Sequence, residues 1–222
     1  MKVVVTAGPT REFLDTVRFL SNPSTGKMGF AVAAEAARRG HEVVLVAGPV
    51  SLPTPKGVSR VDVVSAREMC AAVLAAVGLP DGPSKPTVVV SAAAVADWRP
   101  AVRARSKLKK RQMDGVLKLA RNPDILKTLS RYAARSGGLL KLAGFAAETD
   151  DVLGEASRKC REKGLSFIVA NDVTAAGAGF GVDTNKVSFV YPDGRVESLP
   201  IMSKRTVARR VVAAAERQLC HS

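Results

Sequence analysis

Short apolar runs rich in valine alternate with helical segments along most of the chain, and this alternation constrains the fold more than any other feature. The runs are too apolar to have a wet face, which is typical of parallel strands buried between two layers of helices. We therefore expect an α/β fold: a doubly wound, mostly parallel, Rossmann-like sheet with helices on both faces. The expected strands cover residues 3–8, 42–50, 58–64, 87–95, 116–120, 139–147 and 166–172. The expected helices cover residues 31–40, 66–77, 150–163 and 204–219, and one more follows Asn122-Pro123-Asp124, with the proline at its first helical position.

The C-terminal part of the chain has a different pattern. KVSFV and RVESLP flank a Pro-Asp-Gly turn, which predicts an antiparallel β-hairpin. A length of 222 residues without a repeat or a linker predicts a single domain, residues 1–222. The C-terminal β-hairpin is then an extension within this domain, at about residues 172–200.

Composition narrows the class of protein. No apolar run approaches the roughly 18 residues of a membrane span, and the opening MKVVVTA is too short for a signal peptide, so a cytosolic protein is expected. Cys70, Cys160 and Cys220 are odd in number and far apart, which predicts neither a disulfide framework nor a zinc site. The net charge of +14 indicates an acidic partner: nucleic acid, a membrane surface or phosphorylated small molecules. Only Trp98 lies near the basic run, whereas a nucleic-acid surface would interleave several aromatic residues with the basic ones.

Ligands of an open parallel sheet bind at the carboxyl ends of its strands, so the segments that follow the apolar runs are the informative ones. These segments are residues 8–22, 48–55, 93–100, 145–149 and 171–183. A nicotinamide site would need G-x-G-x-x-G after the first strand and an acidic residue at the end of the second, but the chain reads AGPTREF and VAGPV there. A Walker A loop fails as well, because Ser21 replaces the first glycine and Met28 follows Gly26-Lys27.

The decapeptide SNPSTGKMGF nevertheless has the chemistry of an anion site. Ser24, Thr25 and Gly26 would present hydroxyls and backbone N–H groups at a helix start, and Lys27 would neutralise charge. The alternative is that Ser24 is only the N-cap of the helix. A second cationic stretch, ARSKLKKRQ, is either a solvated face or a lid that folds cations over a polyphosphate.

Nucleophilic catalysis has little support in the sequence. His41 lies at a helix-to-strand turn and His221 at the C-terminus, so neither a Ser-His-Asp nor a Cys-His system is expected. A lysine-rich anion site without a nucleophile indicates chemistry by positioning and charge stabilisation, as in phosphoryl or nucleotidyl transfer.

Seven stretches, in order along nearly the whole chain, resemble the phosphopantothenate–cysteine ligases, the phosphopantothenoylcysteine synthetases of coenzyme A biosynthesis, in their bacterial form. These stretches are TAGPTREFLDTVRFLSNPSTGKMG, GPVSLPTP, AAAVADWRP, KLKK, NPDIL, GFAAET, and ANDV with GFGVDTNKV. The resemblance implies a two-step ligase that uses Mg2+ and a nucleoside triphosphate, CTP in bacterial members and ATP in eukaryotic ones. The carboxylate of 4'-phosphopantothenate attacks the α-phosphate to give an acyl-cytidylate and pyrophosphate, and the amine of L-cysteine then displaces CMP.

The resemblance also implies roles for individual residues. Lys107 would be the catalytic cation on the lid, and Asn22 would hold the acyl-nucleotide while the amine attacks. Ser24, Thr25, Gly26 and Lys27 would bind the phosphate of the acyl substrate. The nucleotide site would comprise Ser91, Ala92, Ala93, Asp97, Lys107, Pro123, Asp124, Ile125, Leu126, Phe145, Lys159 and Lys163. For Phe145 the alternative is core packing, and for Lys159 and Lys163 it is a solvated helix face.

Partners are implied in the same way. Family members act as homodimers that share the pantothenate site, and the hairpin region after Asn171 is the expected dimer arm. Many bacterial relatives carry a flavin-dependent decarboxylase domain on the N-terminal side of the ligase. Neither a nucleic acid nor a membrane is expected as a partner. The remaining alternatives are an NAD(P)-type Rossmann oxidoreductase and a basic module that binds nucleic acid.

Overall fold

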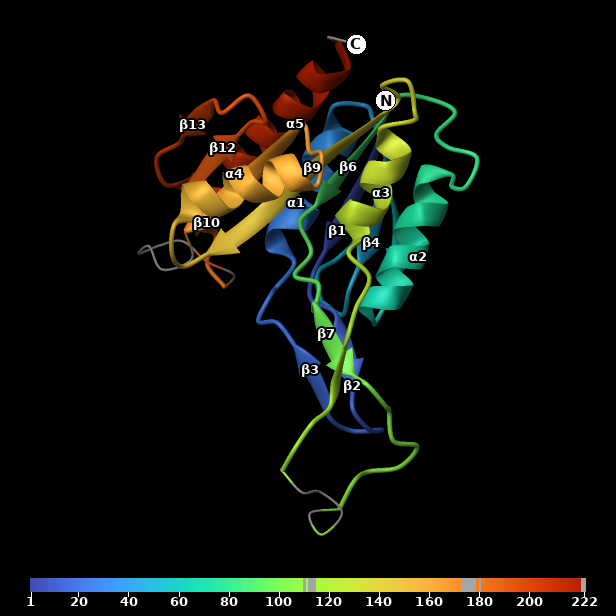
Figure 1. Cartoon of the computed structure of the whole chain (residues 1–222). Helices are drawn as coiled ribbons and strands as arrows, with labels where there is room; N and C mark the ends of the chain where they lie inside the picture. Colours follow the sequence, from blue (N-terminus) through green and yellow to red (C-terminus); the bar gives the residue numbers. More distant parts are fainter. Residues whose placement is uncertain (110, 112–114, 173–178, 180, 221–222) are drawn as a thin grey trace.

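The computed structural model of the chain describes residues 1–109, 111, 115–172, 179 and 181–220. An eight-stranded sheet forms the centre, in the order β13-β12-β10-β9-β6-β1-β4-β5 (Figure 1). Six neighbouring strands are parallel, and β12 and β13 continue the sheet as an antiparallel edge. The parallel strands are β1 (Lys2–Ala7), β4 (Glu42–Ala47), β5 (Val58–Asp62), β6 (Thr87–Ser91), β9 (Leu140–Glu148) and β10 (Phe167–Asp172). The edge strands are β12 (Val187–Val190) and β13 (Val196–Ser198).

Helices cover both faces of this sheet. On one face α1 (Lys27–Arg38) and α5 (Lys204–Cys220) pack side by side, and their apolar residues form one core cluster with the strands. On the other face α2 (Ala66–Val77), α3 (Ile125–Ala133) and α4 (Val152–Glu162) enclose a second cluster. The α/β fold with a doubly wound, mostly parallel sheet, helices on both faces and a C-terminal hairpin is confirmed.

Several local predictions are corrected by the structure. The strand expected at residues 87–95 ends at Ser91, because the chain leaves the sheet there. Pro123 is not the first residue of α3, since Asp124 is the N-cap and its side chain accepts from the Lys127 N–H. Ser24 is not the N-cap of α1 either. That position is Gly26, which adopts a left-handed φ of 78°.

Three small two-stranded sheets were not predicted at all. They pair β2 (Arg11–Phe13) with β3 (Phe19–Ser21), β7 (Trp98–Pro100) with β8 (Leu119–Arg121), and β11 (Thr184–Asn185) with β14 (Met202–Ser203). The strand expected at residues 116–120 therefore shrinks to part of β8 and lies outside the central sheet. The two pairs β2–β3 and β7–β8 extend away from the carboxyl ends of the central strands as a protruding arm (Figure 1).

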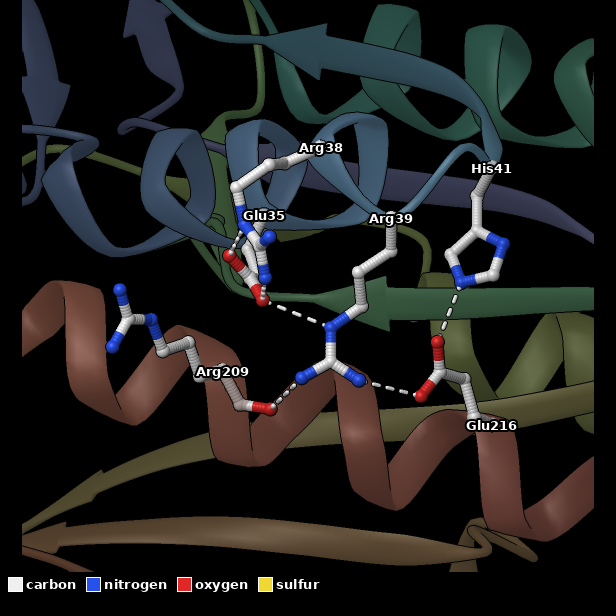
Figure 2. Close-up of polar contacts among 6 residues, drawn as sticks. All are labelled: Glu35, Arg38, Arg39, His41, Arg209 and Glu216. Carbon is white, nitrogen blue, oxygen red and sulfur yellow. Dashed lines mark hydrogen bonds and ion pairs between the residues drawn. The ribbon is translucent and has the colours of Figure 1, made fainter.

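Polar contacts fasten α1 to α5 near the end of α1 (Figure 2). The Glu35 carboxylate accepts from Arg38 at 2.7 Å and from Arg39 at 2.8 Å, and it is 4% exposed. Arg39 also donates to Glu216 of α5 at 2.7 Å. His41 lies 2.8 Å from the same carboxylate of Glu216, so this histidine belongs to the helix contact, as its poor position in the sequence indicated.

The other sequence-based expectations have mixed outcomes. Cys70 and Cys160 are free and buried in the core, as expected, while the side chain of Cys220 lies outside the described residues. His221 and Lys110 also lie outside them, as do residues 112–114 and, within the hairpin region, residues 173–178 and 180. Among the described helices, none is both long and apolar enough to cross a bilayer.

Candidate functional site

A cleft of about 410 Å³ lies at the switch point of the sheet, where the chain passes from adding strands on one side of β1 to adding them on the other side. From β1 the chain proceeds through α1 to β4 on one side, and it later returns through α2 to β6 on the other side. Such a switch point is where doubly wound sheets bind ligands, beyond the carboxyl ends of the strands. The lining residues are Asn22, Ser24, Thr25, Gly26, Lys27, Met28, Ala92, Ala93, Ala94, Val95, Phe145, Ala146, Ala147, Asn171, Gly179, Asn185 and Lys204.

Two buried threonines fix the wall that follows β6. The Thr6 hydroxyl accepts from the Ala93 N–H at 3.1 Å, and the Thr10 hydroxyl accepts from the Ala96 N–H at 3.0 Å. The Ala94 N–H donates to the carbonyl of Gly8 at 2.9 Å. The backbone of this segment is therefore held in place without a ligand, as expected for a preorganised binding wall.

Asn22 joins that wall to the segment before α1. Its Nδ2 group donates to the carbonyl of Ala94 at 3.1 Å, and the residue lines the cleft. Ser21 next to it donates to the Thr10 carbonyl at 2.8 Å. The sequence-predicted residue Asn22 is thus positioned from both sides of the switch point.

The start of α1 forms the next part of the cleft. Ser24 accepts from the Gly26 N–H at 3.4 Å. A side chain at Gly29 would lie 2.5 Å from the Cβ of Ala7, so glycine lets the helix approach β1 closely. Lys27 donates to the Asp183 carboxylate at 2.7 Å and to the Gly181 carbonyl at 3.1 Å. The hydrogen bond from Lys27 lowers the pKa of Asp183.

Three polar residues in the cleft were missed by the sequence reasoning: Asn171, Asn185 and Lys204. Lys204 begins α5 and is 6% exposed, and its ammonium donates to the Gly179 carbonyl at 2.9 Å. Desolvation, with the charge of Lys27, lowers the pKa of Lys204. Asn171 is the penultimate residue of β10 and begins the segment 171–183 that the sequence marked as informative, so it had a signal although no role was predicted for it. Lys204 had none, because a lysine at a helix start usually faces solvent.

The predicted nucleotide residues divide into two groups. Ala92, Ala93 and Phe145 line the cleft, and Ser91, the last residue of β6, precedes Ala92 in the chain. The others are not among the cleft residues: Asp97, Lys107, Pro123, Asp124, Ile125, Leu126, Lys159 and Lys163. Asp97 is exposed on the segment that follows, and its carbonyl accepts from the Asn122 N–H at 2.8 Å.

The α3–α4 side of the predicted nucleotide site is a cluster of ion pairs. Lys163 lies 3.0 Å from Asp124, and Lys159 pairs with Glu148 at the end of β9. Burial opposes the charge of Asp124, but the hydrogen bonds from the Lys127 N–H and from Lys163 lower its pKa. The side chains of Ile125 and Leu126 are buried in the core, so only their backbone groups are suited to contact a ligand there.

Lys107 lies on the protruding arm and is exposed. The neighbouring Leu108 is clamped by two side chains: its N–H donates to Asp15 at 3.2 Å, and its carbonyl accepts from Arg18 at 2.9 Å. Arg18 itself donates to Asp15 at 2.7 Å. Burial opposes the charge, but hydrogen bonds from Arg18, Val17 and Leu108 hold the pKa of Asp15 well below its usual range. The middle of the basic stretch is therefore fixed, at Leu108, to the turn between β2 and β3.

The whole chain matches known proteins. Residues 1–218 match the family described as the DNA/pantothenate metabolism flavoprotein C-terminal domain. The coenzyme A biosynthesis bifunctional protein CoaBC of Bacillus subtilis is 46% identical over 220 residues, which cover 97% of this chain and 52% of that protein. CoaBC of Escherichia coli is 45% identical over 212 residues, which cover 94% and 50%. The chain thus spans about half the length of these curated relatives.

A solved structure agrees with these matches. The crystal structure of the C-terminal domain of coenzyme A biosynthesis bifunctional protein CoaBC superimposes with a TM-score of 0.80 and 39% identity. The superposition covers 100% of this chain and 96% of that one.

Proposed function

The chain belongs to the family of DNA/pantothenate metabolism flavoprotein C-terminal domains, and from this we propose that it is a phosphopantothenoylcysteine synthetase of coenzyme A biosynthesis. It joins 4'-phosphopantothenate to L-cysteine at the expense of a nucleoside triphosphate, which we take to be CTP. The observation that carries the proposal is the cleft at the switch point, where Asn22, the start of α1 and the fixed wall Ala92–Ala94 meet. The match to relatives of the CoaBC type supports the same assignment.

The proposed reaction has two steps. In the first, a carboxylate oxygen of 4'-phosphopantothenate attacks the α-phosphorus of CTP, and the bond to the leaving pyrophosphate breaks. In the second, the amine of cysteine attacks the acyl carbon, the amide bond forms, and CMP leaves as the amine loses a proton. Neither step needs a nucleophile from the protein, in keeping with a described site that holds amides, hydroxyls and lysines.

The residues of the cleft suit these steps in different ways. Asn22, held by the Ala94 carbonyl, would orient the acyl group of the intermediate toward the incoming amine. The fixed backbone of Ala92 and Ala93 would bind the nucleotide without reorganisation. Lys107, exposed on the arm and outside the residues that line the cleft, would stabilise the charge on the phosphates of the nucleotide.

Mg2+ is part of the proposal as a companion of the nucleotide. Within the described part of the chain, no three acidic, histidine or cysteine side chains cluster as a metal site would require. A cation that is held mainly by phosphates and water needs few protein ligands, and one carboxylate is enough. Asp97 would supply that carboxylate, and bound Mg2+ would neutralise phosphate charge.

Self-association is also proposed, through the protruding arm. Its β2–β3 and β7–β8 pairs expose large apolar side chains that a monomer would leave in water: Val17, Phe19, Trp98, Val102 and Leu119. The predicted hairpin arm is less suited to this role, since β12 and β13 form the edge of the central sheet. Replacing Trp98 by Ser should shift the chain from dimer to monomer in light scattering. An unchanged mass would contradict this assignment.

The test of the activity is a pyrophosphate release assay. The protein is incubated with 4'-phosphopantothenate, CTP and Mg2+, with and without L-cysteine. We expect release that depends on phosphopantothenate, and amide product only when cysteine is present. If neither CTP nor ATP yields pyrophosphate, the proposal is wrong, and hydride transfer to NAD(P) and binding of nucleic acid become the assays to run.

Two variants test the division of roles. Asn22→Asp should still release pyrophosphate but accumulate the acyl-nucleotide. The carboxylate has no N–H group to donate to the Ala94 carbonyl, so it cannot orient the intermediate as the amide does. Lys107→Gln should reduce turnover in both steps. Lys118→Gln is the matched control, since Lys118 is an exposed lysine of the same arm. Amide formation by Asn22→Asp at the wild-type rate would contradict its assigned role.

A further inference from the structure

The predicted nucleotide residues lie on two segments that are far apart in the sequence. One segment is the wall after β6, with Ala92 and Ala93, and the other is the start of α3, at residues 123–126. A nucleotide that contacts both segments needs them at a fixed distance, because a misplacement of about 1 Å can lower the rate by about 10²-fold. In the structure Asn122 joins the two segments.

Asn122 lies just before Asp124, the N-cap of α3, and it contacts the wall with its backbone and with its side chain. Its backbone N–H donates to the carbonyl of Asp97 at 2.8 Å, and its Nδ2 group donates to the carbonyl of Ala96 at 2.8 Å. The N–H of Ala96 in turn donates to the hydroxyl of Thr10 at 3.0 Å. Both backbone groups of Ala96 are thus held, and through them the start of α3 is connected to the fixed wall of the cleft.

Arg99 determines the orientation of the Asn122 amide. The Nη1 group of Arg99 donates to the Oδ1 atom of Asn122 at 3.2 Å and also to the carbonyl of Arg121. A guanidinium can only donate, and a backbone carbonyl can only accept. If the amide were turned by 180°, its NH2 group would face Arg99 and its oxygen would face the carbonyl of Ala96, so both hydrogen bonds would be lost. The Nδ2 group is therefore directed at Ala96.

The helix itself does not depend on these contacts. Ile125, Leu126 and Leu129 of α3 are buried in the core, and the Asp124 side chain caps the helix by accepting from the Lys127 N–H at 3.0 Å. Without the Asn122 side chain, α3 should still form and pack, and only its start should move relative to the wall. The contacts of Asn122 therefore set a position more than they stabilise an element.

We propose that Asn122, oriented by Arg99, is a positioning residue for the nucleotide. It keeps the start of α3 at a fixed distance from the wall after β6, so that the backbones of both segments bind one nucleotide. The inference rests on the proposed function for the identity of the nucleotide. Asn122 is not among the residues that line the cleft, where Asn22 and the start of α1 lie, so binding of the acyl substrate should not depend on it.

The test compares Asn122→Ala with a matched control at the other end of α3. Asn122→Ala removes the contacts to Ala96 and Arg99 without placing a new charge near the phosphates. The control is Ser136→Ala, because the Ser136 hydroxyl donates to the Ala133 carbonyl at 2.8 Å and accepts from the Leu140 N–H at 3.0 Å. Each variant loses two side-chain hydrogen bonds next to the same helix, so we expect similar falls in Tm.

The two variants should differ in their kinetics. For Asn122→Ala we expect the KM for CTP to rise roughly 5- to 100-fold, as for a polar group left without its partner. The KM for phosphopantothenate should change by less than about threefold, and Ser136→Ala should leave both KM values as in the wild type. An unchanged KM for CTP in Asn122→Ala, an equal rise in both of its KM values, or an equal rise in Ser136→Ala would overturn the proposal.

Arg99 provides a second test. Arg99→Met should raise the KM for CTP, because the Asn122 amide loses the contact that orients it. Arg99→Lys should recover part of the effect, since lysine retains a donor. In the double variant of Arg99→Met with Asn122→Ala, the KM for CTP should equal that of Asn122→Ala alone. Multiplied effects would show that Arg99 does not act through Asn122 and would overturn its assigned role.

Calorimetry separates this inference from the proposed function. If the wild type releases no pyrophosphate, the proposed function fails, but titration with CTP in the presence of Mg2+ still measures the nucleotide site. Weaker CTP binding by Asn122→Ala and Arg99→Met, with unchanged binding by Ser136→Ala, would support the inference. If Asn122→Ala does not fold, Arg99→Met and Arg99→Lys give the same comparison. A wild type that binds neither CTP nor ATP, or variants that bind CTP as tightly as the wild type, would overturn it.

Discussion

The contact between α1 and α5 can be tested at Glu35, whose carboxylate is 4% exposed and accepts hydrogen bonds from two arginines. Hydrogen bonds from Arg38 and Arg39 outweigh burial and lower the pKa of Glu35 from the usual 4.5 to about 2. At about 1.4 kcal/mol per unit this corresponds to roughly 3 kcal/mol. Arg38 is 59% exposed, so solvent screens its contribution to this free energy. We therefore expect Glu35→Gln to lower the free energy of unfolding by about 2 kcal/mol.

Thermal unfolding at pH 7 measures this change. For a chain of this size about 2 kcal/mol corresponds to a fall in Tm of roughly 4–8 °C. Glu162→Gln is the matched control, because Glu162 is exposed and its ion pair is with Arg158 on the same helix, so the substitution should lower the free energy of unfolding by less than about 0.5 kcal/mol. Equal Tm values for the two variants would refute the reasoning.

The dependence on pH gives a second check of the same prediction. The folded pKa of Glu35 lies below the unfolded one, so its contribution is complete above about pH 4.5 and is lost as the pH falls toward 2. The difference in stability between the wild type and Glu35→Gln should be constant from pH 6 to 8 and shrink below pH 4.5. A difference that grows in acid would contradict the assignment of the shift to the two arginines.

Two further substitutions probe how the fold positions the cleft. Gly29→Ala should lower the Tm and raise the KM for phosphopantothenate, because the new Cβ would lie 2.5 Å from the Cβ of Ala7 and push α1 off the sheet. Overpacking lowers the free energy of unfolding by about 1–3 kcal/mol, whereas the higher helix propensity of alanine raises it by about 1 kcal/mol. A higher Tm would therefore refute the close contact. Asp15→Asn should reduce kcat through Lys107, because Asp15 holds the Leu108 N–H at 3.2 Å. The double variant with Lys107→Gln should then be no slower than Lys107→Gln alone, and additive losses would show an independent role.

The central sheet was predictable because its strands are continuous apolar runs that suit only a buried parallel strand, as in TVVVS of β6. The three small sheets were not, since strands of two or three residues such as Trp98–Pro100 carry too few positions to show a period. Their pairing depends on the tertiary structure, which brings Trp98 opposite Arg121. The same reason explains why residue type and spacing predicted the first residue of α3 and the N-cap of α1 at Pro123 and Ser24, each two residues before the observed position.

The cleft was predictable only in part, and the reason lies in how it is assembled. Asn22, Ser24 and Lys27 are close in sequence, so a local pattern revealed their chemistry. Lys204 enters the cleft because α5 packs against α1, and no local pattern encodes that contact. Lys107 is the opposite case. Its basic neighbours are evident in the sequence, but the structure fixes the adjacent Leu108 to Asp15 and Arg18, and Lys107 does not line the cleft.

The two helices that meet in this contact each place a lysine at the cleft, Lys27 at the start of α1 and Lys204 at the start of α5. A cation near a helix N-terminus is unfavourable, because it meets the positive end of the dipole. At the cleft Lys27 forms an ion pair with Asp183, and at the far end of α1 the arginines pair with Glu35 and Glu216. Residues that oppose a local preference, such as a lysine at the start of a helix, often occur at functional sites. The ion pairs of Glu35 and Glu216 therefore hold the two helices in register, and this keeps both lysines in place at the cleft, so that an anionic ligand could bind there without reorganisation.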